Sequence, residues 1–132
     1  MQRMTKQRQA VLDELTRVND FRSAQQIFED LRTNGQHVGM ATVYRYLQGL
    51  AEDGRIDALR SSEGESLYRI CTSNSHHHHL VCRECGHAEE IEQSQIEAWV
   101  TSVAQGHGFA NVEHSLELFG TCVSCQEKNR TA

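Results

Sequence analysis

Four cysteines in two close pairs constrain this chain more than any other feature of its sequence. Cys82 pairs with Cys85 and Cys122 with Cys125, with two residues inside each pair and 36 residues between the pairs. Two intervening residues let one tight turn aim both sulfurs at a single point, and two such turns make a tetrahedral four-cysteine zinc site. Because the gap of 36 residues is longer than in a compact zinc finger, we expect a small subdomain to fill it.

Two other interpretations of these cysteines stay open at this point. Disulfides need an oxidising compartment, and the first eight residues show no apolar segment of a secretory signal. A redox Cys-x-x-Cys motif is typical of a single turn in a βαβ setting, whereas this chain has two such turns. The lack of a long apolar run predicts no membrane span.

A run of four histidines, residues 76–79, directly precedes the first cysteine pair. In an extended segment alternate side chains share a face, so His77 pairs with His79 on one side and His76 with His78 on the other. Each pair needs further ligands from elsewhere in the chain. The run therefore predicts two additional metal sites, one on each face of the segment.

Candidate partners for these histidines are metal-ligating residues in unusual sequence surroundings: Asp57, Cys71, Glu97 and His114. The aspartate interrupts an apolar strand pattern, and the cysteine is the odd one of five. The glutamate adjoins the apolar stripe of an expected helix over residues 94–103, and the last histidine lies on the apolar face of an expected strand over 112–118. Taken singly, each also fits an ordinary role as a buried thiol, a core histidine or a solvated carboxylate.

The first seventy residues carry a different pattern, with no cysteine and one histidine. Apolar residues at helical spacing and at alternate positions predict three helices and then a hairpin, over about 5–18, 23–35, 40–53, and 55–70. Three helices followed by a two-stranded wing indicate a winged helix-turn-helix domain. A plain helical bundle is the other interpretation.

Charge divides the chain at the same point. Residues 1–70 are neutral overall, whereas residues 71–132 carry the whole net charge of −5 and all five cysteines. The step predicts two small domains that divide near residue 70. The acidic total argues against broad nonspecific binding to nucleic acid but leaves room for a local basic face.

In a winged helix the third helix enters the major groove, where arginine bonds guanine and threonine or tyrosine contacts phosphate or a methyl group. Basic residues and helix N-termini nearby suit phosphate contacts. We therefore expect DNA contacts from two groups: Thr42, Tyr44 and Arg45 on the third helix, and Lys6, Arg8, Arg22 and Ser23 on or near the first two helices.

Three segments in combination resemble the ferric uptake regulator family. They are Gly39–Leu47, His76–Gly86 and Phe119–Cys125, and the likeness extends over about residues 3–125. The resemblance implies a homodimeric, cytoplasmic transcriptional repressor with no small organic substrate. It also implies an α+β protein with a winged-helix domain over 1–70, a linker over 71–75 and a small α/β domain over 76–132. The winged helix would read a palindromic operator in double-stranded DNA, and the C-terminal domain would dimerise.

The resemblance also implies up to three zinc ions per chain and assigns the ligands that spacing alone leaves open. The structural site matches Cys82, Cys85, Cys122 and Cys125. A regulatory site between the wing, the linker and the second domain matches Asp57, Cys71, His77 and His79. An additional regulatory site within the second domain matches His76, His78, Glu97 and His114.

Departures from the family pattern favour its zinc uptake branch, of the kind found in actinobacteria. Arg22 and His78 stand where many iron- or peroxide-sensing relatives have histidine and aspartate. A Cys71 thiolate suits tetrahedral zinc, whereas all-nitrogen and oxygen sets suit iron or manganese. The alternatives are sensing of iron, manganese, nickel or peroxide, a zinc hydrolase that uses the histidine- and glutamate-rich site, and a zinc storage module without DNA binding.

Overall fold

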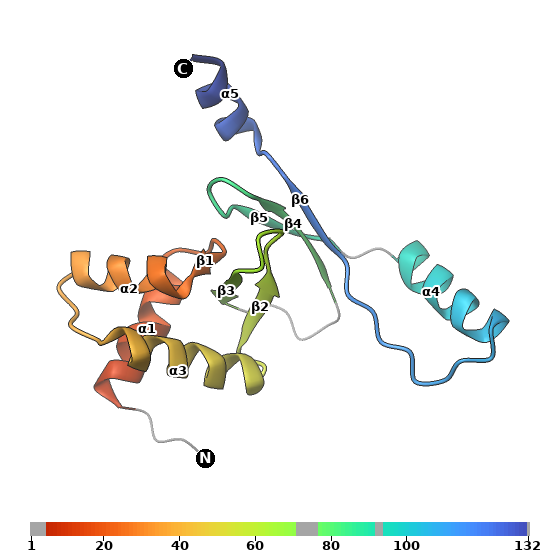
Figure 1. The fold of residues 1–132 in the computed structure, drawn as a ribbon, viewed down its shortest axis with the longest axis horizontal. Helices are drawn as coiled ribbons and strands as arrows, with labels where there is room; N and C mark the ends of the chain where they lie inside the picture. Colours follow the sequence, from red (N-terminus) through yellow and green to blue (C-terminus); the bar gives the residue numbers. More distant parts are fainter. Residues whose placement is uncertain (1–4, 71–76, 92–93, 132) are drawn as a thin grey trace.

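The computed structural model describes residues 5–70, 77–91 and 94–131 (Figure 1), so Cys71 and His76 lie outside the described residues. Its elements in chain order are α1 (Lys6–Arg17), β1 (Arg22–Ser23), α2 (Ala24–Thr33), α3 (Met40–Glu52), β2 (Ile56–Arg60), β3 (Ser66–Ile70), β4 (His78–Cys82), β5 (Ala88–Ile91), α4 (Ser94–Gly106), β6 (Glu117–Gly120) and α5 (Val123–Thr131). The strands form one antiparallel sheet, ordered β1-β3-β2, and one mixed sheet, ordered β5-β4-β6. This arrangement confirms the predicted α+β class.

The three N-terminal helices begin and end close to the predicted residues. The hydroxyls of Thr5 and Ser23 accept hydrogen bonds from the third backbone N–H beyond them, which caps α1 and α2. The chain leaves α2 and α3 through Gly35 and Gly54, whose φ angles of 82° and 74° suit glycine. Local capping and termination signals therefore set these boundaries.

Each of these helices turns one apolar stripe toward a shared core. The side chains that are at most 1% exposed there are Val11, Leu15, Ile27, Leu31, Val43, Leu47 and Leu50. Full burial of such a side chain contributes about 1.5–3 kcal/mol, so these stripes dominate the stability of the helical layer. Ile56 and Tyr68 of the hairpin close the same core from one side.

The hairpin is the wing. β2 and β3 pair antiparallel from Ile56 opposite Ile70 to Arg60 opposite Ser66, and β1 joins the outer edge of β3. The hydroxyl of Ser61 accepts the backbone N–H groups of Glu63 and Glu65 and so orders the connecting turn. Three helices with this wing confirm the predicted winged helix-turn-helix.

The second sheet is built around β4, which lies antiparallel to β5 and parallel to β6. The expected strand over 112–118 is wrong: β6 begins only at Glu117, and Val112 and Leu118 are 45% and 43% exposed. The reason is pairing, because β4 offers partners only for residues 117–120 among the described residues. The helix expected over 94–103 is confirmed as α4, which Figure 1 shows standing away from the N-terminal helices.

A small apolar cluster joins the two sheets. Phe21, Leu59, Val81 and Ala88 are buried against one another between the wing and the β4–β5 ribbon. The backbone N–H of Phe21 also donates to the carbonyl oxygen of Gly86 at 2.9 Å. A Cβ at Gly86 would collide with the Phe21 carbonyl, and its φ of 82° also favours glycine. Close backbone packing therefore fixes how the second sheet meets the winged helix.

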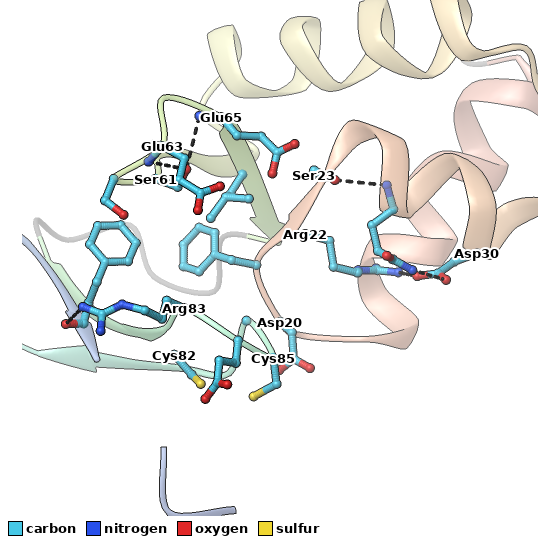
Figure 2. Close-up of a pocket in the computed structure, with 17 residues that line it drawn as sticks. Asp20, Arg22, Ser23, Asp30, Ser61, Glu63, Glu65, Cys82, Arg83 and Cys85 are labelled. Carbon is cyan, nitrogen blue, oxygen red and sulfur yellow. Dashed lines mark hydrogen bonds and ion pairs between the residues drawn. The ribbon is translucent and has the colours of Figure 1, made fainter. Parts of the chain in front are cut away.

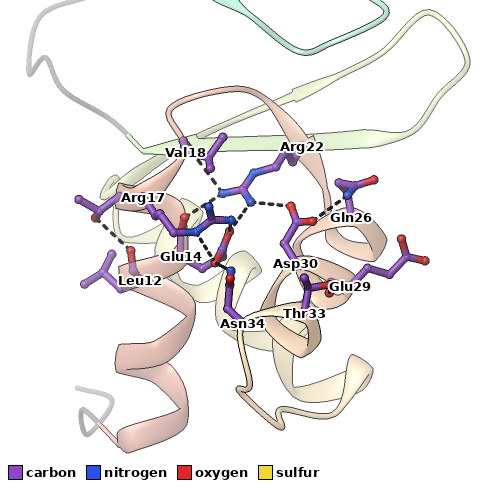
Figure 3. Close-up of polar contacts among 11 residues, drawn as sticks. Leu12, Glu14, Arg17, Val18, Arg22, Gln26, Glu29, Asp30, Thr33 and Asn34 are labelled. Atoms are coloured by element: carbon purple, nitrogen blue, oxygen red, sulfur yellow. Dashed lines mark hydrogen bonds and ion pairs between the residues drawn. The ribbon is translucent and has the colours of Figure 1, made fainter.

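A buried ion-pair network ties α1 to α2 (Figure 3). The Glu14 carboxylate accepts hydrogen bonds from Arg17 and Arg22, each at 2.6 Å, and from the Asn34 amide at 3.0 Å. Arg22 also pairs with Asp30 at 2.9 Å. Although burial opposes ionisation, these arginines hold the pKa of Glu14 below its ordinary value of 4.5.

No helix among the described parts of the chain is long and apolar enough to cross a membrane.

Replacing Glu14 with glutamine should destabilise the fold by about 3 kcal/mol at neutral pH, because two arginines lose their buried counter-charge. The folded-state pKa of Glu14 lies below the unfolded one, so its contribution is complete above about pH 4.5 and is lost as the pH falls through the folded-state pKa. Urea unfolding at pH 7 and pH 3.5 measures both effects.

The matched control is Glu29→Gln, which removes an exposed carboxylate of α2. An equal loss in both variants, or a gap between wild type and Glu14→Gln that widens in acid, would contradict the account.

Candidate metal centres and nucleic-acid interface

Strand β4 presents neighbouring histidines to opposite faces of its sheet. His78 and His79 are 2% and 5% exposed, and side chains alternate along a strand. His79 shares its face with Val81 and points toward the winged helix, with its ring 5.1 Å from that of Phe21. His78 points to the other face, toward Glu97 of α4. Among the described histidines, each face of β4 thus has one group of possible metal ligands.

The first cluster, here called the interdomain site, consists of Asp57, His77, His79 and Glu90. One ligand atom from each lies within 4.8 Å of all the others. The Nε2 atoms of His77 and His79 lie 3.2 and 3.1 Å from the same Oδ2 atom of Asp57. The aspartate comes from the wing and the histidines from the second domain, so the site spans both.

Glu90 and Glu117 also lie at the interdomain site, and the sequence analysis identified neither of them. Glu90 stands opposite His79 on β5, and Glu117 stands opposite it on β6, so all three share one face of the sheet. Oε2 of Glu117 lies 3.1 Å from Nδ1 of His79. A carboxylate on Nδ1 orients the ring and leaves Nε2 for a metal. Only the strand register reveals these partners, which no spacing in the sequence encodes.

Hydrogen bonding between acids and imidazoles sets the charge state of the interdomain site. Burial raises the pKa of Asp57, but hydrogen bonds from His79 and His77 outweigh it and hold that pKa below its usual value. Burial lowers the pKa of His79, yet Asp57 and Glu117 raise it to about 9. A histidine must be neutral to bind a metal ion. Binding of a cation to His79 is therefore coupled to the loss of a proton from its imidazole.

The second cluster, here called the α4 site, consists of His78, Glu97 and His114. Nε2 of His78 lies 2.8 Å from Oε1 of Glu97, and Nε2 of His114 lies 3.0 Å from its Oε2. The rings of the two histidines are 5.3 Å apart. Glu97 comes from the first turns of α4, and His114 comes from the loop before β6 rather than from the expected strand. The loop nevertheless places the His114 imidazole beside its predicted partners, His78 and Glu97.

The third cluster consists of the four paired cysteines. The Sγ atoms of Cys82 and Cys125 lie 3.8 Å apart, and those of Cys85 and Cys122 lie 3.7 Å apart. A sulfur tetrahedron with Zn–S bonds of about 2.3 Å has edges of about 3.8 Å, whereas a disulfide needs about 2.05 Å. All four are free cysteines, so the geometry fits a zinc ion and does not fit two disulfides.

One of these thiols is already poised as a ligand. Burial raises the pKa of Cys82, but backbone N–H groups of Cys122, Cys85 and Glu84 lower it to about 6. The thiolate is the form that binds metal. The β4–β5 turn, which holds Cys82 and Cys85, therefore supplies backbone donors as well as sulfurs.

A cavity of about 450 Å³ separates this turn from the wing (Figure 2). Figure 2 shows Asp20 beside Cys85, with Glu63 and Glu65 on the opposite wall. Five acids and two arginines line the cavity. This acidic lining does not suit a phosphate.

The predicted DNA contacts divide into exposed and buried groups. Tyr44 is 45% exposed on the outer side of α3, where Arg45 is exposed and Thr42 half-buried. Lys6 is exposed at the start of α1, and the Ser23 hydroxyl caps α2. These residues keep their predicted placement near two helix N-termini and on the third helix.

Two of the predicted phosphate contacts are wrong on geometric grounds. Arg22 is 7% exposed, and its guanidinium is held by Glu14, Asp30 and backbone carbonyls. Arg8 is 3% exposed and lies 3.6 Å from Asp53. A buried arginine that supports helix packing cannot also reach a phosphate without breaking that packing. Sequence alone did not distinguish these arginines from surface ones.

Comparison with known proteins supports the combination of winged helix and metal clusters. The sequence model of the Ferric uptake regulator family matches residues 1–119. The zinc uptake regulation protein of Mycobacterium tuberculosis is 48% identical over 124 residues, which cover 94% of this chain and 95% of that protein.

Solved structures agree. FurB of M. tuberculosis, a zinc uptake regulator, superposes with a TM-score of 0.55 at 48% identity, over 91% of this chain and 92% of that one. A zinc uptake regulator complexed with zinc and DNA superposes with a TM-score of 0.72 at 27% identity, over 97% of this chain and 86% of that one.

Fold and clusters define a metal-binding winged-helix regulator. The chain belongs to the ferric uptake regulator family. This membership identifies a transcription regulator rather than the zinc hydrolase considered from the sequence.

Replacing Glu117 with glutamine should weaken zinc binding at the interdomain site about 10- to 100-fold, because His79 loses the charged partner on Nδ1. Competition with a chelator of known affinity measures the change. Glu89→Gln is the matched control, since Glu89 is exposed on β5 and its carboxylate pairs with the exposed His87, away from the site. Equal affinity in wild type and Glu117→Gln would contradict the orienting role.

Replacing Cys85 with serine should cost one zinc per chain and lower the melting temperature by roughly 10 °C or more, because the energy of structural zinc binding is folding energy. Thermal unfolding and metal analysis of the same sample measure both. Ser124→Ala is the control, since it changes an exposed residue between Cys122 and Cys125 and leaves all four sulfurs in place. A Cys85→Ser protein with the wild-type melting temperature and zinc content would overturn the structural site.

Proposed function

We propose that this protein is a cytoplasmic, zinc-dependent transcriptional repressor that controls zinc uptake genes. As a homodimer it binds a palindromic operator in double-stranded DNA when its regulatory zinc sites are filled. The observation that carries the proposal is the pairing of Asp57 from the wing with His77 and His79 from the second domain. The zinc uptake regulators among its relatives, one of them complexed with zinc and DNA, support the same conclusion.

Three zinc ions per chain have ligand sets under this proposal. The four cysteines hold a structural ion, and Asp57, His77 and His79 hold a regulatory ion together with Cys71. His78, Glu97 and His114 hold an additional regulatory ion together with His76. The fit of the described donors supports these sets, while Cys71 and His76 rest on the sequence resemblance.

The proposed regulation depends on the two domains sharing the ligands of the interdomain site. A divalent ion shared by the wing and by β4 links the two domains, and so fixes the angle at which each winged helix leaves the dimer. Two recognition helices must be about one helical turn of DNA apart, or a multiple of it, to read a palindrome. Ordering the domains before they meet DNA reduces the entropy lost on binding. By linkage, DNA must then raise zinc affinity by the same factor as zinc raises DNA affinity.

An exposed apolar face supports dimerisation through the second domain. Trp99 and Phe109 are 67% and 69% exposed, and with Val103 and Val112 they line a shallow apolar depression on and beside α4. Large apolar side chains left open in one chain are typical of a protein interface. We assign residues 1–70 to the DNA-binding domain, 71–75 to the linker and 76–132 to the dimerisation domain.

Glu90 favours a second candidate signal. The Glu90 carboxylate lies beside Asp57 and adds oxygen donors to the site. Oxygen donors suit manganese or iron better than a cysteine thiolate does. The same fold and the same coupling would then serve a regulator of another metal.

The direct test is DNA binding while free zinc is buffered upward, with iron, manganese and nickel in parallel. The probe is a palindromic duplex selected from a random library by the zinc-loaded protein. Tight binding should begin only above one zinc per chain, and Asp57→Asn should weaken zinc-dependent binding about 10- to 100-fold. Asp13→Asn, which removes an exposed acid of α1, should match wild type.

Binding that ignores metal, or that follows manganese or iron at concentrations where zinc is inert, would contradict the zinc signal.

Replacing Arg45 with alanine should weaken operator binding by about 1–3 kcal/mol while leaving zinc content and dimerisation unchanged, because its side chain is exposed on α3. Fluorescence anisotropy at fixed salt measures the affinity. Arg130→Ala, on exposed α5, removes the same charge far along the chain and controls for net charge. A similar loss in both variants would show that α3 does not read the operator.

A further inference from the structure

Arg69 crosses from the wing to the second sheet at the edge of the interdomain site. It lies on β3, is 6% exposed, and its Nη1 atom lies 3.1 Å from Oε1 of Glu90 on β5. Glu90 is one of the four members of the interdomain site. A buried cation therefore stands directly behind one of the candidate ligands.

Three contacts hold the Arg69 guanidinium in one place. Besides the bond to Glu90, its Nε donates to the backbone carbonyl of Asn19 at 3.0 Å, and its central carbon lies 5.8 Å from the centre of the Phe21 ring. Phe21 is itself buried and packs edge-on against His79. The arginine thus cannot swing away from Glu90 without disturbing both the wing and the packing around His79.

This ion pair limits how Glu90 can meet a metal. A carboxylate that uses both oxygens occupies two coordination positions, but Oε1 of Glu90 is engaged by Arg69. The proposed regulatory set of Asp57, Cys71, His77 and His79 already supplies the four donors that zinc prefers. A chelating Glu90 would raise that number to six. Manganese and ferrous iron prefer six, so the same change would favour them.

We propose that Arg69 is a specificity-determining residue of the interdomain site. By holding Oε1 of Glu90 it keeps that carboxylate from chelating, keeps the coordination number low and so favours zinc over manganese and iron. This inference rests on the proposed function, because it assumes that the interdomain site takes the regulatory ion.

The test uses cobalt(II), whose visible bands are intense in four-coordinate sites and weak in six-coordinate ones. All proteins carry Glu97→Gln, which removes the shared carboxylate of the α4 site, and keep zinc in the cysteine cluster. Cobalt is added to this background, to Arg69→Met, to Glu90→Gln and to the double variant Arg69→Met/Glu90→Gln. Affinities for zinc and manganese are measured in parallel by competition.

The expected result is that the background and Glu90→Gln proteins give intense bands. Arg69→Met should give weak bands, and its manganese affinity relative to zinc should rise about ten-fold or more. The double variant should return to the intense bands and the original metal preference, because a neutral side-chain amide in place of the carboxylate is a poor chelator. If the double variant regains the background spectrum, the change in Arg69→Met is caused by the released Glu90 carboxylate and not by disturbed packing.

An Arg69→Met protein with the background spectrum and metal preference would overturn the inference. So would a double variant that keeps the altered spectrum, since the cause would then be packing. Failure of the proposed function looks different: Asp57→Asn would leave both the zinc count and the zinc dependence of DNA binding unchanged.

Discussion

The structure depends on the alternation of side chains along strand β4. β4 is the central strand of its sheet, and its neighbouring residues point to opposite faces and so meet different parts of the molecule. His79 reaches the wing through Asp57, whereas His78 reaches α4 through Glu97. The same strand ends at Cys82, which begins the cysteine cluster. One five-residue strand thus brings all three candidate metal sites together.

Few apolar residues are buried between the two domains, so the polar contacts between them matter more for how the domains are held together. Four residues make up the buried cluster between the sheets, against eleven in the core of the winged helix. Polar contacts between the described parts of the two domains include the Phe21–Gly86 backbone bond, the Arg69–Glu90 pair and the bonds of Asp57 to two histidines. A metal ion bound by Asp57 and these two histidines would strengthen the contact between the domains. At so small a contact, a few kcal/mol decide whether the domains stay docked.

Local signals made most of the fold predictable. Caps at Thr5 and Ser23, helix exits at Gly35 and Gly54, and the turn after Arg60 are encoded within a few residues of where they act. The cysteine spacing and the alternation of the histidines likewise predicted the clusters. What the sequence did not reveal depends on register and burial. Glu90 and Glu117 become partners of His79 only through strand pairing, and Arg8 and Arg22 differ from surface arginines only in their packing.

The central claim is that zinc at the interdomain site sets the position of the winged helix. Its most direct test is a distance measurement by pulsed electron spin resonance between the two protomers of the dimer, with one labelled unnatural amino acid per chain at the exposed position Gln48 on α3. A single narrow distance distribution should form over the same range of buffered zinc in which DNA binding appears, and Asp57→Asn should stay broad. A rise in DNA affinity with no change in the distribution, or an Asp57→Asn variant that narrows like wild type, would contradict the account.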